Sequence, residues 1–89
     1  MRAVITVIGK DMVGILAKVS GICFDSGVNV TEVTQSILQD LFAMIMMVDL
    51  AGSTTPFPEL AEKMKQLGEE LGLSIHVMHE DIFNSMHKI

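Results

Sequence analysis

Hydrophobic and polar positions divide the chain into six segments of regular structure and a short tail. Four segments are dense in apolar and β-branched residues, which is typical of strands. Two others repeat apolar residues at intervals of three and four, which predicts amphipathic helices. The strands are expected at 2–8, 28–38, 41–50 and 73–79, and the helical stripes at 15–23 and 60–71.

Residues that favour helix ends flank both predicted helices. Asp11 is the expected N-cap of the first helix, and Gly27 is the expected glycine just beyond its end. Thr55 and Pro56 are expected to be the N-cap and the first residue of the second helix, which ends at Gly72. The helices are therefore bounded on both sides by residues of suitable conformation.

The strands differ in how evenly they are apolar. Segments 2–8 and 41–50 are nearly continuous apolar runs, so both faces of each strand are expected to be covered and 41–50 is placed in the centre of a sheet. Segment 28–38 mixes Val and Thr with polar residues, which predicts an edge strand with one solvent-exposed face. The turn between these last two strands falls at 39–40.

The resulting order is strand, helix, strand, strand, helix, strand, which is the βαββαβ pattern of the α+β ferredoxin-like sandwich. Right-handed crossovers put both helices on one face of a four-stranded antiparallel sheet of order 4-1-3-2. The other face then has no element of its own to cover it, although segment 41–50 is apolar on both sides. A second protomer or the C-terminal tail is expected to shield that face.

The tail at 81–89 follows a predicted domain at 1–80 and carries a short apolar stripe. Asp81 is its expected N-cap, and the stripe consists of Ile82, Phe83, Met86 and Ile89. A helix this short is unstable unless it packs. We therefore expect it to dock on a sheet, either that of its own chain or that of a partner.

Composition and charge limit the classes of partner. Eighty-nine residues form one domain, and its 49% hydrophobic residues include eight Met and neither Trp nor Tyr. Such a chain buries only about 60 to 65% of its unfolded surface, so self-association would add stability. The net charge is −5 and the six basic residues are scattered, which argues against a nucleic-acid partner. The longest apolar run is too short for a membrane span, and no signal peptide is expected.

Catalytic and metal chemistry find little support. No serine lies in a Gly-x-Ser-x-Gly setting, and no P-loop is present, so no enzymatic activity and no cofactor are expected. His76 and His79 would face opposite sides of a strand, and no thiolate pair accompanies them or His87, so hydrogen bonding is preferred over a metal site. The single Cys23 is expected in the core and indicates a reducing cytoplasm.

The turn at 9–14 joins the first strand directly to the first helix. Gly9 is expected to take a positive φ where the strand ends, and Gly14 leaves space above the first helical turn. A helix start of this kind suits a small anion. At the far end of the same helix, residues 27–30 (Gly-Val-Asn-Val) open the second strand.

The Gly-x-Asp-x-x-Gly-Ile-Leu turn at 9–16, the Gly-x-Asn-Val entry at 27–30 and the βαββαβ order together resemble the ACT domain. The resemblance covers essentially the whole chain. The tail at 79–87 (HEDIFNSMH) is similar to those of short stand-alone ACT-domain proteins of bacteria and archaea. The resemblance implies a regulatory module that dimerises and often holds an amino acid between the first loop of one subunit and the second strand of its neighbour.

By that resemblance, the ligand-facing positions are Gly9, Lys10, Asp11, Met12, Val13, Gly14 and Asn29. Many members of the family have proline just before the second glycine, where this chain has Val13. Chemistry gives a matching account: backbone amides at 12–14 would receive a carboxylate and the Asn29 oxygen an ammonium. Two plainer interpretations stay open, in which Asp11 is only an N-cap and Asn29 only supports the start of a strand.

The sequence thus predicts a cytoplasmic, homodimeric regulatory module that senses an amino acid or a related small metabolite. The Met-rich strand is interpreted as interface filler. The alternative is a ligand-free homodimeric interaction module that regulates an enzyme or a transcription factor. A polar cavity beside Gly14 and Asn29 would favour sensing, whereas a loop collapsed onto Val13 would favour the alternative.

Overall fold

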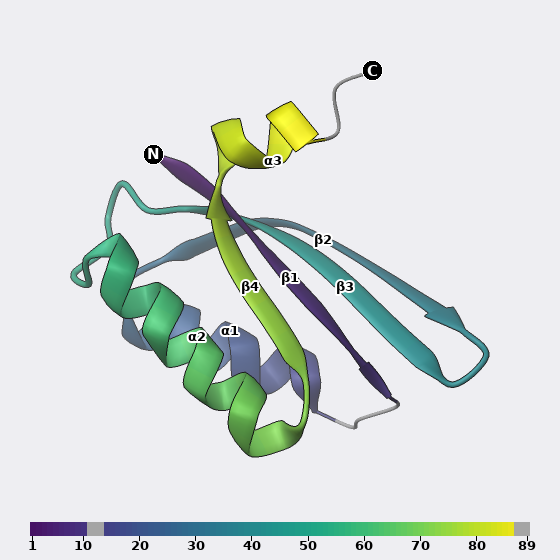
Figure 1. Ribbon diagram of the computed structural model, residues 1–89. Helices are drawn as coiled ribbons and strands as arrows, with labels where there is room; N and C mark the ends of the chain where they lie inside the picture. The colour runs from purple at the N-terminus through teal and green to yellow at the C-terminus, as the bar shows by residue number, and fades with distance from the viewer. Residues whose placement is uncertain (11–13, 87–89) are drawn as a thin grey trace.

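Seven elements make up the computed structural model, which describes residues 1–10 and 14–86 (Figure 1). The strands are β1 (Arg2–Lys10), β2 (Asn29–Leu38), β3 (Leu41–Asp49) and β4 (Ser74–His79). The helices are α1 (Ile15–Asp25), α2 (Phe57–Leu71) and α3 (Glu80–Met86). Within the described residues no helix is long and apolar enough to cross a membrane.

The four strands form one antiparallel sheet of order β2-β3-β1-β4. This is the predicted 4-1-3-2 order read from the other edge, so the predicted ferredoxin-like βαββαβ fold is confirmed, including a helix at the C-terminal end. α1 and α2 lie together on one side of the sheet, and α3 stands apart from them at the end of β4 (Figure 1). We call the sheet side away from α1 and α2 the open face.

The hydrophobic core lies between the sheet and these two helices. Alternate residues of β3 point into it, and Met44 and Met46 are almost fully buried there. Leu60 and Met64 of α2 and Val19 of α1 meet them from the helical side, all of them fully buried. Their spacing of four residues in α2 keeps both side chains on one helical face, which explains why the predicted stripe forms the contact.

Burial along the sheet differs from the sequence expectation for three strands. β3 is fully buried on one face only, because Leu41 and Ile45 on its other face remain exposed. In β1 both faces are buried at residues 3–5, but Ile8 on the open face is exposed. β2 is exposed on both faces along most of its length, because the β2–β3 hairpin reaches away from α1 and α2 (Figure 1). The predicted cover for the open face is therefore incomplete within one chain.

The helix ends agree with the sequence at the C-termini and differ at the N-termini. Gly27 and Gly72 both have positive φ just beyond α1 and at the end of α2, as predicted. The N-cap of α1 is Gly14, so Asp11, which is outside the described residues, is not the N-cap of this helix. The N-cap of α2 is Pro56 instead of Thr55, with Pro58 in its first turn. Each of these two helices therefore starts later in the chain than the sequence predicts.

Candidate functional site

The predicted ligand loop begins at the end of β1. Lys10 is exposed there, and Gly9 lies within the strand without the positive φ that the sequence led us to expect. The reason for a glycine is packing instead, because a Cβ at position 9 would lie 2.2 Å from Leu73 Cδ2. Gly14, on the other side of the loop, has φ 84°. The predicted site residues Asp11, Met12 and Val13 lie outside the described residues, as does the test of a loop collapsed onto Val13.

The start of α1 has the properties of an anion-binding helix terminus. Gly14 caps it without a side-chain hydrogen bond, and the first turn carries no acidic residue. The first N–H groups of an α-helix have no partner within the helix, and its dipole adds partial positive charge at the same end. A Cβ at Gly14 would meet no atom of residues 1–10 or 16–86 within 4 Å, so none of these residues fills the space beside it.

Asn29 lies at the opposite end of the sheet from this loop. It pairs with Asp49 on β3, which pairs with Arg2 at the start of β1. Lys10, beside the loop, is eight residues along β1 from Arg2, a distance of roughly 26 Å at about 3.3 Å per residue. A single chain therefore keeps Asn29 apart from Gly9 and Lys10.

Two cavities of the described part lie away from these residues. One, of about 210 Å³, lies between α1 and α2 and is lined by Ile22, Lys63, Gln66, Leu67 and Glu70. The other, of about 240 Å³, lies between the open face and α3. Neither is lined by Gly14 or Asn29, so neither is the polar cavity that the sensing hypothesis describes within one chain.

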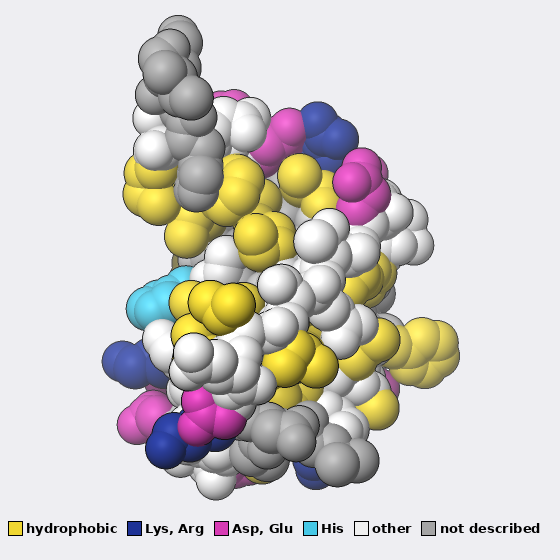
Figure 2. Space-filling model, turned by 90° about the vertical axis from the view of Figure 1, so that its right-hand side faces the viewer, with side chains coloured by type: hydrophobic (Ala, Val, Ile, Leu, Met, Phe, Trp, Pro, Cys, Tyr) yellow, Lys and Arg dark blue, Asp and Glu magenta, His cyan; other side chains and the backbone are white. Residues whose placement is uncertain are grey.

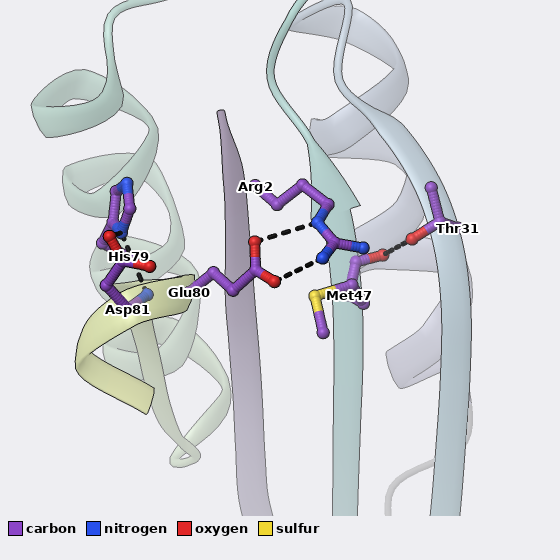
Figure 3. A network of polar contacts seen from close by, with 6 residues as sticks. All are labelled: Arg2, Thr31, Met47, His79, Glu80 and Asp81. Carbon is purple, nitrogen blue, oxygen red and sulfur yellow. Dashed lines mark hydrogen bonds and ion pairs between the residues drawn. The ribbon is translucent and has the colours of Figure 1, made fainter. Parts of the chain in front are cut away.

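Sequence reasoning missed a polar network at the end of the sheet where β2 starts (Figure 3). Arg2 forms a two-pronged ion pair with Glu80: its Nε donates to Oε2 at 2.9 Å, and Nη2 donates to Oε1. Hydrogen bonding to Glu80, and then the charge of that carboxylate, raise the pKa of Arg2. The available signal was a single charged residue at the start of an apolar strand, but its partner is far away in sequence.

The histidines take part in local hydrogen bonds. His76 Nε2 lies 3.0 Å from Ser74 Oγ, and His79 Nδ1 accepts the backbone N–H of Asp81 at 3.0 Å. Figure 3 shows the second contact at the start of α3. No cluster of three or more metal-ligating side chains occurs in the described ranges. His87 is outside these ranges.

Cys23 is a buried core residue of α1, in agreement with the sequence. Burial raises the pKa of its thiol to about 11, so the thiolate is disfavoured near neutral pH. A neutral, enclosed thiol is a poor nucleophile. Its position is explained by packing alone.

Comparisons with known proteins agree with this geometry. The sequence model of the ACT domain matches residues 2–78. A UPF0237 protein of Methanopyrus kandleri is 42% identical over 88 residues, covering 99% of this chain and 98% of that protein. An ACT domain protein from Streptococcus pneumoniae has a TM-score of 0.80 at 34% identity, with 93% of each chain covered.

A regulatory protein is also among the similar structures. The regulatory subunit of aspartate kinase from Thermus thermophilus, in its ligand-free form, has a TM-score of 0.64 at 26% identity. The match covers 85% of this chain and 49% of that subunit. The same fold thus occurs both in small proteins of this length and as part of a larger regulatory chain.

Proposed function

The chain belongs to the ACT domain family, and from that membership we propose that it is a regulatory module that binds an amino acid or a related small metabolite between two copies of itself. The similarity to a regulatory subunit of aspartate kinase supports the regulatory part of this proposal. The relative from Methanopyrus kandleri has nearly the same length, so a small stand-alone ACT protein is the appropriate comparison.

The separation of Asn29 from the loop at 9–14 is the observation that carries the dimeric part of the proposal. β2 is at the edge of the sheet, so a second β2 has room to pair with it. In an antiparallel pairing, the start of one β2 lies beside the end of the other. The end of β2 at Leu38 is level with Lys10 across the sheet. Two copies would therefore bring Asn29 of each protomer toward the loop of its partner.

The start of α1 and the side chain of Asn29 supply complementary groups for binding an amino acid. Unpaired N–H groups at the start of α1 would donate to the carboxylate, with the helix dipole adding about 0.3 to 1 kcal/mol. The side-chain oxygen of Asn29 would accept from the ammonium, and its NH₂ group can donate as well. A ligand held by both protomers stabilises the dimer, so the dimer population reports the ligand concentration.

Calorimetric unfolding against the twenty amino acids tests this proposal without tryptophan or tyrosine fluorescence, because both residues are absent. At 100 times its Kd, a ligand adds about 2.7 kcal/mol to stability. We expect one amino acid to raise Tm in a concentration-dependent way, and Asn29→Ala to abolish the rise. Asn84→Ala, an exposed asparagine on α3, is the matched control and should respond like the wild type.

A second pair of variants tests the loop. Gly14 and Gly72 both have positive φ, and a Cβ at either would meet no atom of the described residues within 4 Å, its chain neighbours aside. Alanine at either position therefore costs a similar amount of backbone strain, roughly 1 to 2 kcal/mol. Only Gly14→Ala should weaken the ligand response. Equal responses in the two variants would remove the loop from the site.

The exposed apolar surface of the sheet favours a second candidate function. A ligand-free interaction module would use such a surface to bind an enzyme or a transcription factor that it regulates. If no amino acid changes Tm although the protein self-associates, this second function replaces the first.

A further inference from the structure

The open face holds an apolar groove. Part of its lining comes from residues beyond those that the ACT domain model matches. The groove is the cavity of about 240 Å³ between the sheet and α3, and its lining includes Thr6, Ile8, Ala43, Ile45, Phe83 and Met86. α3 lies beyond residues 2–78, which the ACT domain model matches. On the molecular face shown in Figure 2, hydrophobic side chains gather in the upper part of the view and continue in patches farther down.

α3 covers only one half of the open face. It contacts β1 and β4, and Arg2 holds its first residue, Glu80. At this end Val4 is fully buried. Toward the other end, Ile8 is 46% exposed and Ile45 is 44% exposed. Because alternate residues of a strand share a face, these side chains form one surface of which half is bare.

α3 also keeps apolar surface of its own. Ile82 is 55% exposed and Met86 is 62% exposed, and none of the residues of α3 is buried. The two residues are four apart, so they lie on the same stripe of the helix. A helix of seven residues gains its stability from packing, and here part of its apolar stripe is unused.

We propose that the open face binds the open face of a second copy of this chain, with α3 of each copy lying over the bare half of its partner's sheet. A two-fold arrangement of this kind needs a surface that is complementary to itself. One half of this face presents a free apolar helix, and the other half presents a free apolar sheet. The interface is distinct from the β2 edge and does not depend on ligand binding.

The available area is close to what a stable dimer needs. The exposed large apolar side chains on this side are Ile8, Leu38, Leu41, Ile45, Ile82 and Met86. At roughly 100 Å² each, they present on the order of 600 Å² per copy, against about 800 Å² per partner in a standard interface. Charged residues of the described sheet lie at the ends or edge of this face, as Arg2, Lys10 and Glu32 do. An apolar centre with a charged rim is typical of a protein interface.

Sedimentation equilibrium of three lysine variants tests the proposal. Ile45→Lys places a charge on the bare sheet, and Ile82→Lys places one on the free stripe of α3. Phe24→Lys is the matched control, because Phe24 is exposed on α1, on the other side of the sheet. We expect Ile45→Lys and Ile82→Lys each to halve the mass of the wild-type assembly, and Phe24→Lys to leave it unchanged.

Circular dichroism checks that each variant remains folded, which the exposure of all three positions favours. Unchanged mass in both Ile45→Lys and Ile82→Lys would overturn the proposal, and so would a wild-type protein that is monomeric at millimolar concentration. Failure of the ligand proposal gives a different result, because it removes the amino-acid response and leaves the effect of the face variants on mass intact.

Discussion

Gly68 and Gly21 are both helical glycines, but they have different surroundings. A Cβ at position 68 would lie 2.8 Å from the backbone oxygen of Leu73 and 3.3 Å from Ile75, whereas a Cβ at position 21 would meet nothing within 4 Å. Alanine gains up to about 1 kcal/mol over glycine in a helix, but overpacking costs about 1 to 3 kcal/mol. We expect Gly68→Ala to be net destabilising and Gly21→Ala to be stabilising.

Urea unfolding followed by circular dichroism measures both glycine variants. Gly21→Ala is the internal control for helix propensity, because it changes the same group without a contact. A stabilised Gly68→Ala would mean that α2 and β4 can separate at no cost. The close packing around Gly68 would then contribute nothing to the free energy of unfolding.

Cys23 gives a prediction about pH. Burial raises the pKa of its thiol from an ordinary 9.0 to about 11. Because the folded-state pKa is raised, the thiol's contribution to stability is fully present below its ordinary pKa and is lost as the pH rises through about 11. We expect the difference in unfolding free energy between wild type and Cys23→Ala to narrow between pH 9 and 11. A difference that stays constant over this range would show that the thiol ionises freely in the folded protein.

At the scale of elements, α3 depends on the residue that precedes it. His79 Nδ1 accepts the N–H of Asp81 and so satisfies one of the unpaired donors at the start of this helix. Losing a cap costs roughly 0.5 to 2 kcal/mol. We expect His79→Ala to reduce the hydrogen-exchange protection of the α3 amides by about tenfold, which corresponds to about 1.4 kcal/mol.

His76→Ala is the control for the α3 prediction. His76 Nε2 is hydrogen-bonded to Ser74 Oγ within β4, so its loss should leave the α3 amides unchanged. Equal loss of protection in both variants would point to a general loosening of β4, and the capping role of His79 would be wrong.

Periodicity predicted the elements because burial against a single core imposes spacing on each of them. Met44 and Met46 alternate into the core, and Leu60 and Met64 follow a helical repeat, so their positions carry the pattern. The N-cap of α1 was misassigned because Asp11 has the right side chain, whereas the backbone of Gly14 sets the start. Local sequence does not contain that choice.

Contacts between residues far apart in the chain could not be predicted either, because local sequence carries no signal of them. Gly9 is needed because a Cβ there would meet Leu73, and Arg2 forms an ion pair with Glu80. Neither interaction produces a periodic pattern in the sequence. The loop and Asn29 were named as candidate site residues, but only the strand register places them at opposite ends of the sheet. The apolar outer face of β3 indicated a missing cover, which one chain supplies only in part.

At the scale of the whole molecule, self-association should appear as stability that depends on concentration. An 89-residue chain buries a modest share of its surface, and this one also exposes Ile45 and Ile82 on the same side. For an assembly that unfolds to monomers, a tenfold increase in concentration adds about 1.4 kcal/mol per association step, which raises Tm by roughly 4 °C for two chains of this size.

We therefore expect Tm of the wild type to rise by roughly 12 °C from micromolar to millimolar concentration, about 4 °C for each tenfold step, measured by calorimetry without ligand. Ile45→Lys should have a smaller dependence, because it removes one interface while leaving the core of each chain unchanged. Phe24→Lys should keep the full dependence. If Tm of the wild type is independent of concentration, each chain is stable alone and the exposed apolar face contributes nothing to folding, which would leave binding of a different protein as the reason for its composition.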